Sequence, residues 1–415
     1  MEFQKWGRKA IDFICTPPAE DAFITILEGS VRSGKTVSMI PKWINYIMTG
    51  PPGLLLMTGV SKDTVYDNVL NDLFDTLGDN HYKYNRQSGE LDIFWEYKGQ
   101  PCSRRIKVVG AKDEGSEKFI RGKTLAGAYC DELTLMPEHF FKQLLNRLSV
   151  KGAKLYGTTN PDSPMHYLYK EYITNESMLR DGVVKDIHFM LDDNPNLPAE
   201  YKANIRRSYS GMWYKRMILG MWVLAEGLIY DMVSDAMLYN DDDLNKTMRS
   251  RCRRYIAVDY GTKNPMVFLD ILDDGETIWV DGEYYWDSRA MQRQKTDAQY
   301  ADDLADFIGD EYPDFIIIDP SAASFKLVCQ GKGFRVKDAD NSVNDGIRVT
   351  AMLISQGRLK VNRKCTGTLA EFQTYVWDEK AAANGKEQPL KVNDHSMDAL
   401  RYYCKTMVAK WRLRE

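Results

Sequence analysis

The sequence predicts an α/β protein of two domains, each built on its own β-sheet. A chain of 415 residues is too long for one ordinary hydrophobic core. In the first half, apolar strands alternate with helices, beginning with the strand, turn and helix of FITILEGSVRSGKTVSMI at residues 23–40. In the second half, three apolar strands follow one another, and two strands of this half end in an aspartate.

The composition fits a soluble globular protein, with 44% hydrophobic and 27% charged residues. No run approaches the roughly 18 apolar residues of a membrane span, and the start MEFQKWGRKA lacks a signal-peptide core. We therefore expect a cytosolic location and no membrane partner. The seven cysteines are scattered without a C-x-x-C pair, so they support neither a zinc ribbon nor a disulfide framework.

The formal net charge of -4 argues against a protein that coats nucleic acid through bulk charge, but it leaves room for a local basic channel. Basic clusters lie at residues 206–207, 251–254 and 410–414. Each cluster is either a DNA contact or a solvated face.

The first strand and helix enclose a phosphate-binding loop. Gly29, Gly34, Lys35 and Thr36 match G-x-x-x-x-G-K-[ST]. In this motif backbone N–H groups and a helix N-terminus face the anion, the lysine reaches the terminal phosphates, and the threonine holds Mg²⁺. The sequence therefore predicts an ATP or GTP site. Pro41 removes a helix donor two turns later, so we expect the helix to be kinked or shortened there.

Two more loop residues belong to the predicted nucleotide contacts, Arg32 and Ser33. An arginine inside such a loop either contacts phosphate, as an arginine finger on its own or a neighbour's nucleotide, or points to solvent.

Further strands at residues 53–59 and 104–109, with a helix at residues 63–77 between them, predict a doubly wound, mostly parallel sheet. A small apolar run at residues 125–130 then carries Asp131 and Glu132 to the end of a strand. We expect Asp131 to bind the Mg²⁺ held by Thr36, and Glu132 to orient and deprotonate the attacking water. The alternative is a surface Asp-Glu pair that starts a helix. Hydrolysis would make the first half a P-loop ATPase domain of the type with a catalytic glutamate (ASCE).

KLYGTTNP at residues 154–161 predicts another strand whose exit carries Thr158, Thr159 and Asn160. These short polar side chains either sense the γ-phosphate from a neighbouring strand or serve turn chemistry, because Asn-Pro commonly opens turns. Between about residues 171 and 250 the strand–helix alternation fades, and aromatic residues recur at helical spacing. We expect a small helical piece that joins domains of residues 1–185 and 246–415, with residues 186–245 as a linker subdomain.

The second half places carboxylates on three elements. Asp259 ends an apolar strand that opens an antiparallel meander at residues 254–285, and Asp319 ends a strand expected beside the first one. Asp394, His395 and Asp398 open the last helix, where either Asp394 or His395 shares a face with Asp398.

This order of elements is the ribonuclease H-like plan, whose chemistry needs carboxylates near two hard cations, Mg²⁺ or Mn²⁺. Asp259, Asp319 and Asp398 are the predicted ligands and catalytic residues of a nuclease. His395 is a further ligand or a hydrogen-bond donor, while Asp394 is a ligand or a helix cap.

The motifs GSVRSGKT, FIRGKTLAGAYCDE, GTTNP, GMWVLAEGLIY, VDYG, IIIDPSA and DHSMDALRY span nearly the full chain. Together they resemble the large terminase subunit of tailed bacteriophages. The resemblance implies Walker A residues Lys35 and Thr36, a loop arginine at Arg32, a Walker B pair at 131–132 and a coupling motif at 158–160. It also implies a nuclease lined by Asp259, Asp319, Asp398 and His395, and Gln4 as the adenine contact.

The resemblance further implies ATP-driven translocation of double-stranded DNA into a viral procapsid and metal-dependent cleavage of concatemeric DNA. It implies a small terminase subunit and a portal protein as partners, a ring of subunits on the portal or a monomer in solution, and the host cytoplasm as location. Two other functions are compatible with the motifs: an ATP-dependent helicase-nuclease of repair or recombination, and a nucleotide-switched assembly factor with an inactive nuclease-like domain.

Overall fold

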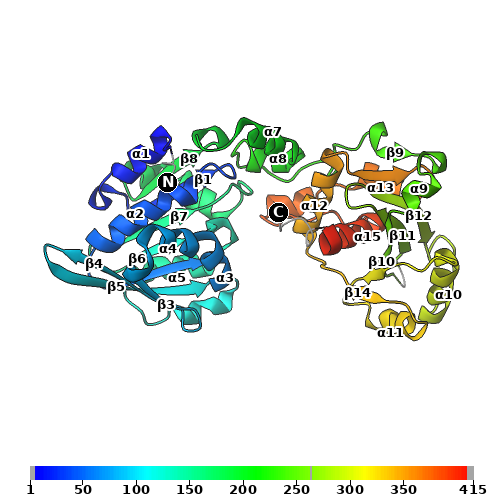
Figure 1. Cartoon of the computed structure of the whole chain (residues 1–415), viewed down its shortest axis with the longest axis horizontal. Helices are drawn as coiled ribbons and strands as arrows, with labels where there is room; N and C mark the ends of the chain where they lie inside the picture. Colours follow the sequence, from blue (N-terminus) through cyan, green and yellow to red (C-terminus); the bar gives the residue numbers. More distant parts are fainter. Residues whose placement is uncertain (1–4, 262–263, 409–415) are drawn as a thin grey trace. The chain divides into compact units, whose positions relative to one another are not determined.

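The structure, a computed structural model, describes residues 5–261 and 264–408. These residues form two compact units (Figure 1). Unit 1 contains the chain up to Lys202 together with Tyr214–Leu224, and unit 2 contains Ala203–Trp213 and the chain from Ala225 onward.

The core of unit 1 is an eight-stranded sheet in the order β3-β4-β5-β2-β6-β7-β1-β8. Neighbouring strands from β5 to β8 pair in parallel, and β3 and β4 extend one edge through antiparallel pairs. The strands are β1 (Ile24–Gly29), β2 (Leu54–Gly59), β3 (Tyr82–Asn85), β4 (Glu90–Tyr97), β5 (Gln100–Gly110), β6 (Leu125–Cys130), β7 (Lys154–Thr158) and β8 (Val184–Phe189).

Apolar residues cover both faces of this sheet, as the predicted doubly wound plan requires. Ile26 and Leu56 belong to one buried cluster, whereas their chain neighbours Leu27 and Met57 belong to another. The helices are α1 (Arg8–Cys15), α2 (Lys35–Thr49), α3 (Lys62–Val65), α4 (Asn71–Leu77), α5 (Glu138–Arg147) and α6 (Glu176–Arg180), with α7 (Ala199–Arg207) and α8 (Gly211–Met217) where the chain passes between units.

Helix α2 continues through Pro41 to Thr49, so the expected shortening of this helix is wrong. The strand β8, which was not predicted, spans the expected boundary at residue 185 and pairs with β1 inside unit 1. The proposed linker subdomain at residues 186–245 stays a prediction.

Unit 2 holds a seven-stranded sheet in the order β14-β13-β10-β11-β12-β15-β9. The strands are β9 (Leu238–Tyr239), β10 (Arg253–Asp259), β11 (Met266–Asp273), β12 (Ile278–Trp286), β13 (Phe315–Ile318), β14 (Val336–Asp338) and β15 (Leu359–Asn362). The antiparallel meander β10-β11-β12 and the parallel pairing of β13 beside β10 confirm the predicted fold class. The short parallel strand β9 beside β15 was not expected.

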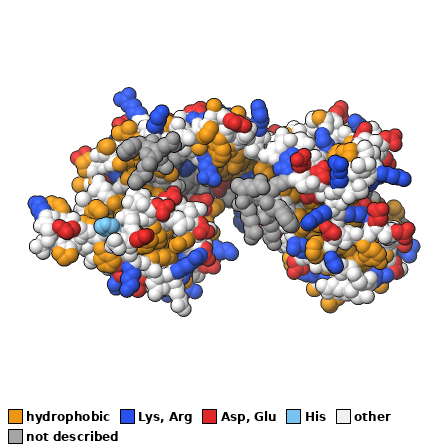
Figure 2. Space-filling view, viewed as in Figure 1, with side chains coloured by type: hydrophobic (Ala, Val, Ile, Leu, Met, Phe, Trp, Pro, Cys, Tyr) orange, Lys and Arg blue, Asp and Glu red, His pale blue; other side chains and the backbone are white. Residues whose placement is uncertain are grey.

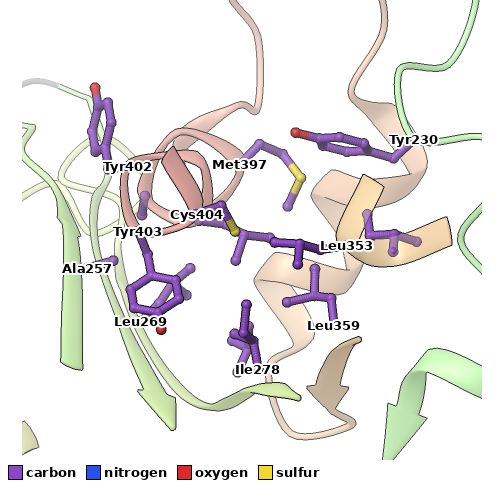
Figure 3. Packing of buried hydrophobic residues seen from close by; sticks show 14 of the residues in the cluster. Tyr230, Ala257, Leu269, Ile278, Leu353, Leu359, Met397, Tyr402, Tyr403 and Cys404 are labelled. Carbon is purple, nitrogen blue, oxygen red and sulfur yellow. The ribbon is translucent and has the colours of Figure 1, made fainter. Parts of the chain in front are cut away.

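Helix α15 (His395–Tyr403) of unit 2 packs against the middle of the sheet. Figure 3 shows Met397, Tyr403 and Cys404 directed into an apolar cluster with Leu269 and Ile278 from the strands. This packing fixes α15 over β10 and β11, and with it the acidic start of the helix. The helices are α9 (Lys246–Arg249), α10 (Asp297–Ile308), α11 (Ala323–Gly331), α12 (Val343–Ser355), α13 (Thr366–Thr374), α14 (Glu379–Ala383) and α15 (His395–Tyr403).

On the face that Figure 2 shows, Lys/Arg and Asp/Glu side chains are interspersed over each unit. Within the described ranges, no helix is long and apolar enough to cross a membrane. The predicted adenine contact Gln4 and the basic cluster at residues 410–414 lie outside the described residues.

Candidate active sites

A polar cleft of about 670 Å³ opens in unit 1 at the carboxyl ends of β1, β6 and β7, the edge where open α/β sheets bind ligands. The phosphate-loop residues 31–36, the acidic pair at 131–132 and residues 158–160 line it together, with Asn68 and Asn194. The fold thus brings most of the predicted nucleotide contacts to one place.

Backbone conformation explains why the loop needs its glycines. Gly29 has φ +127°, and a Cβ there would lie 2.0 Å from the carbonyl oxygen of Phe189. Gly34 has φ +95° and immediately precedes α2, so it turns the chain into the helix and leaves the helix N-terminus facing the cleft. Arg32 has φ +55° and an exposed side chain. Its carbonyl accepts a hydrogen bond of 2.9 Å from Asn194.

Lys35 is buried in the loop that precedes its helix. Its Nζ donates to the carbonyl oxygens of Gly29 (3.1 Å) and Ser30 (2.6 Å) and to Asn160 Oδ1 (3.0 Å). A longer contact of 3.4 Å reaches Ser33 Oγ. Burial lowers the pKa of Lys35 to about 8, although nearby carboxylates oppose the shift. The ammonium group that lines the cleft is thus held by three neutral oxygen acceptors, and burial disfavours its charge.

Asp131 and Glu132 follow β6 as predicted. Asp131 is buried, and its carboxylate accepts from Thr158 Oγ1 (2.8 Å) and Asn68 Nδ2 (3.1 Å). Burial raises the pKa of Asp131, and these two donors together with the charge of Lys35 oppose the rise. Glu132 has φ +53°, a conformation that non-glycine residues adopt at a cost of roughly 1–2 kcal/mol.

Thr159 and Asn160 connect two sides of the cleft. Thr159 Oγ1 accepts from the backbone N–H of Thr134 (3.0 Å) and lies 2.8 Å from its hydroxyl. Asn160 contacts Lys35, as described above. The hydrogen bonds link the exit of β7 both to the phosphate loop and to the segment after Glu132.

The segment at residues 214–224 also reaches this site. Met217 accepts a hydrogen bond of 2.8 Å from the backbone N–H of Val31 in the phosphate loop. Arg216, which is 1% exposed, donates to Asp162 Oδ1 (2.7 Å), two residues beyond Asn160. The segment at residues 214–224 is therefore attached to two of the segments predicted to contact nucleotide.

Beneath the phosphate loop lies a second polar cluster. Glu28 is buried and accepts from Trp222 Nε1 (3.0 Å) and from His188 Nδ1. The hydrogen bond to Glu28 raises the pKa of His188, against the effect of burial. No sequence pattern pointed to this cluster, because its members come from β1, β8 and residue 222.

A smaller cleft of about 390 Å³ lies in unit 2 at the carboxyl end of β10 and the start of α15. Asp259, Asp394, His395 and Asp398 line it, as does Lys391. His395 Nδ1 lies 2.9 Å from Asp259 Oδ2. Burial raises the pKa of Asp259, and the hydrogen bond to His395 opposes this rise.

Asp319 does not line this cleft. The register pairs Val258 with Ile318, so Asp259 and Asp319 follow paired positions on neighbouring parallel strands. The Asp319 carboxylate instead accepts from the backbone N–H of Ser321 (2.7 Å) and from Asn341 Nδ2 (3.3 Å). Burial works against ionisation of Asp319, but its hydrogen bonds outweigh burial and hold its pKa below the ordinary value.

Comparison with known proteins decides the family. The family model for the T4-like type of terminase large subunit, N-terminal part, matches residues 26–233. The large terminase of a thermophilic bacteriophage is 35% identical, and its structure superposes with a TM-score of 0.87 over 98% of this chain and 100% of that chain. The chain belongs to the terminase large subunit family.

Two further structures of the same thermophilic phage terminase carry nucleotides. Its ADP complex superposes with a TM-score of 0.84 and its ATP-γ-S complex with 0.83, each at 35% identity over 97% of this chain and 100% of that chain. The comparison with curated proteins gave no match.

The side chains that line each cleft show whether the two predicted metal sites of this terminase subunit have suitable ligands. In unit 1, the hydroxyl of Thr36 and the carboxylate of Asp131 line one cleft, and hydroxyl and carboxylate oxygens suit Mg²⁺. In unit 2, the donor types suit Mg²⁺ or Mn²⁺, but the arrangement does not fit a bound ion. Over residues 5–261 and 264–408, no three His, Cys, Asp or Glu side chains are grouped closely enough to hold a metal.

Sequence reasoning missed the cations of this second cleft. Arg401 is 2% exposed and donates to Asp398 Oδ1 (3.0 Å), and Lys391 reaches the other oxygen of the same carboxylate (3.0 Å). Burial raises the pKa of Tyr402, and the charges of Asp259, Asp398 and Asp319 raise it further. Tyr402 thus lies near all three predicted ligands. Arg401 and Tyr402 belong to the motif DHSMDALRY, three and four residues after Asp398. This spacing in the sequence could have indicated that both side chains lie beside the carboxylates.

Proposed function

We propose that this terminase subunit binds ATP with Mg²⁺ in the cleft of unit 1 and hydrolyses it to drive double-stranded DNA into a viral procapsid. The convergence of the phosphate loop, the 131–132 carboxylates and residues 158–160 on one cleft carries the proposal. The nucleotide complexes of the 35% identical terminase from the thermophilic phage support it.

In this mechanism the terminal phosphates replace the carbonyl oxygens that Lys35 now contacts, while the N-terminus of α2 faces the anion. Thr36 and Asp131 would hold Mg²⁺, which supplies neutralisation of phosphate charge when bound. Glu132 orients the attacking water and accepts its proton. Asn160 contacts Lys35, so a change at the phosphates reaches the exit of β7 and, through Asp162 and Arg216, residues 214–224.

We propose further that unit 2 cleaves DNA with Asp259, Asp319 and Asp398, aided by His395. These residues would hold Mg²⁺ or Mn²⁺ only after moving closer together than the structure has them. The grouping of Asp259, His395 and Asp398 in one cleft supports this activity. A small terminase subunit, a portal protein and a ring of subunits acting in the host cytoplasm complete the proposal.

Separating the two activities tests the proposal. Lys35→Ala should abolish ATP turnover yet still nick plasmid with Mn²⁺, and Asp319→Asn should do the reverse. Lys142→Ala and Asp302→Asn, which remove exposed ion-pair partners, serve as controls and should change neither activity. Loss of both activities in both folded variants would refute two separate sites. Preferential unwinding of forked DNA would favour a helicase-nuclease, and absence of cleavage by the wild type would favour an assembly factor.

A further inference from the structure

The phosphate loop of unit 1 turns through two left-handed backbone positions, Arg32 and Gly34. Their φ angles are +55° and +95°. Gly34 adopts this conformation freely because it has no Cβ. In an arginine the same conformation brings Cβ close to the following carbonyl oxygen and is unfavourable. Arg32 therefore keeps this conformation only where its surroundings hold it.

Asn194 supplies such a contact from a distant part of the sequence. Its Nδ2 donates to the carbonyl oxygen of Arg32 at 2.9 Å, across 162 positions of the chain. Its Oδ1 accepts from the backbone N–H of Asn196 at 3.0 Å, so the amide is fixed with its donor toward the loop. Asn194 also lines the nucleotide cleft, and a Cβ at Gly34 would lie 4.0 Å from its amide group. One side chain thus lies beside both left-handed residues.

The turn at residues 193–196, which carries this asparagine, is held by the N-terminal segment. Asp193 Oδ2 lies 2.7 Å from Lys9 Nζ. Asn196 exchanges two hydrogen bonds with the backbone of Lys5, accepting from its N–H at 3.0 Å and donating to its carbonyl oxygen at 2.9 Å. These contacts anchor the turn at points outside the phosphate loop.

The conformation of residue 32 matters for anion binding. Left-handed positions in a tight turn direct neighbouring backbone N–H groups into one concavity, which binds anions. Residues 31–36 line the cleft, and the N-terminus of α2 faces it. If residue 32 left its conformation, the N–H groups that follow would have to be reordered when phosphate binds. A loop that is already ordered loses less conformational freedom on binding, and its affinity is higher.

We propose that Asn194 is a positioning residue for nucleotide binding: it holds Arg32 in the left-handed conformation and so keeps the phosphate loop ordered for the anion. The inference rests on the proposed ATP-binding function of unit 1, because it concerns the same cleft. It extends the nucleotide site to a residue that the phosphate-loop pattern does not contain.

The affinity of the full-length chain for ATP-γ-S, measured by calorimetry, tests this role. Asn194→Ala should weaken binding by roughly 5- to 30-fold, the range that corresponds to the strain of one left-handed residue other than glycine. In ATP turnover it should raise KM and leave kcat nearly unchanged, because the loop holds phosphate both before and during hydrolysis.

Asn175→Ala is the matched control. It removes an equivalent pair of hydrogen bonds outside the cleft, from the N–H of Met178 at 3.2 Å and to the carbonyl oxygen of Glu171 at 3.1 Å. Asn175→Ala should bind ATP-γ-S as wild type does.

Two backgrounds that differ only in the Cβ of residue 32 show whether Asn194 acts through the loop. Arg32→Ala and Arg32→Gly both lack the guanidinium group, but only Arg32→Gly relieves the strain. Adding Asn194→Ala should again weaken ATP-γ-S binding by roughly 5- to 30-fold in Arg32→Ala, and by less than about threefold in Arg32→Gly. Equal losses in the two backgrounds, or wild-type affinity of Asn194→Ala, would overturn the inference.

Lys35→Ala distinguishes this inference from the proposed function. If Lys35→Ala weakens ATP-γ-S binding and Asn194→Ala does not, the cleft binds nucleotide and only the role of Asn194 is refuted. If Lys35→Ala binds ATP-γ-S as tightly as wild type, nucleotide binds elsewhere and both proposals are refuted.

Discussion

The ion pair between Lys42 and Asp21 offers the sharpest test of how unit 1 holds α2, the helix that follows the phosphate loop. Both side chains are 0% exposed, and Lys42 Nζ lies 2.7 Å from Asp21 Oδ2. Lys42 sits on α2, two turns after Lys35, and also donates to the carbonyl oxygens of Phe13 (3.0 Å) and Thr16. The pair therefore ties α2 to the segment that follows α1.

Lys42→Met leaves the Asp21 carboxylate buried with Tyr156 as its remaining side-chain donor, at 2.9 Å. Removing one partner of a buried ion pair leaves the other charge uncompensated and lowers the free energy of unfolding by about 3–5 kcal/mol. Replacing both partners, as Lys42→Met with Asp21→Leu, should cost clearly less, because no uncompensated charge then remains. The matched control is Lys9→Met, whose pair with Asp193 is partly exposed and should cost under about 1 kcal/mol.

Hydrogen exchange read by mass spectrometry suits this test, because a chain of two units does not unfold in one transition. Peptides from α1 and α2 should lose protection in Lys42→Met, while peptides from unit 2 provide an internal reference. A loss of protection in unit 1 no larger than that of Lys9→Met, or a double variant less stable than Lys42→Met alone, would show that the buried pair does not hold α2 in place.

The electrostatics of unit 1 lead to three further predictions. Because bound phosphates favour the charged form of Lys35, whose pKa is lowered to about 8, ATP-γ-S affinity should fall above pH 8 by up to about tenfold per pH unit. Calorimetry in buffers of different ionisation enthalpy should detect proton uptake when ATP-γ-S binds. Binding without proton uptake at pH 9 would contradict the protonation of Lys35. Thr158→Val removes a hydrogen bond to the carboxylate of Asp131 worth about 1.5–3 kcal/mol. The loss of ATP turnover on the acidic side of the pH profile should then begin at higher pH. An unchanged pH profile would count against the metal-binding role of Asp131. The raised pKa of His188 means that its pair with Glu28 contributes stability fully below about pH 6.5, and this contribution is lost as pH rises through the folded-state pKa. The difference in β1 protection between wild type and His188→Gln should therefore be larger at pH 6 than at pH 9, and equal differences would refute the assignment.

Local patterns were sufficient to predict the phosphate loop, most of the core strands and the meander of unit 2. Glycine at positions 29 and 34 is required by backbone geometry that a short sequence window already shows. The strand β6 formed despite its glycine and alanine, because complete burial between β2 and β7 outweighs weak strand propensity.

Features that depend on distant partners could not be predicted. The strand β8 has only its two end residues buried, so its sequence shows a weak pattern of apolar residues. Its place beside β1 follows from the pairing of Glu28 with His188, two residues that are 160 positions apart in the chain. Lys391 looks like an ordinary exposed loop lysine until the packing of α15 brings Asp394 and Asp398 to it. Asp319 was expected to join Asp259, but the backbone N–H of Ser321 in its own turn and the side chain of Asn341 hold its carboxylate.

In the proposed ATP hydrolysis by unit 1, Glu132 is the residue that activates water. ATP turnover and ATP-γ-S affinity of Glu132→Gln, compared with wild type and with the exposed control Glu138→Gln, test it most directly. We expect Glu132→Gln to lose roughly 10²- to 10⁴-fold in turnover, while its ATP-γ-S affinity stays within about a few-fold of wild type. Turnover by Glu132→Gln close to that of wild type would contradict it.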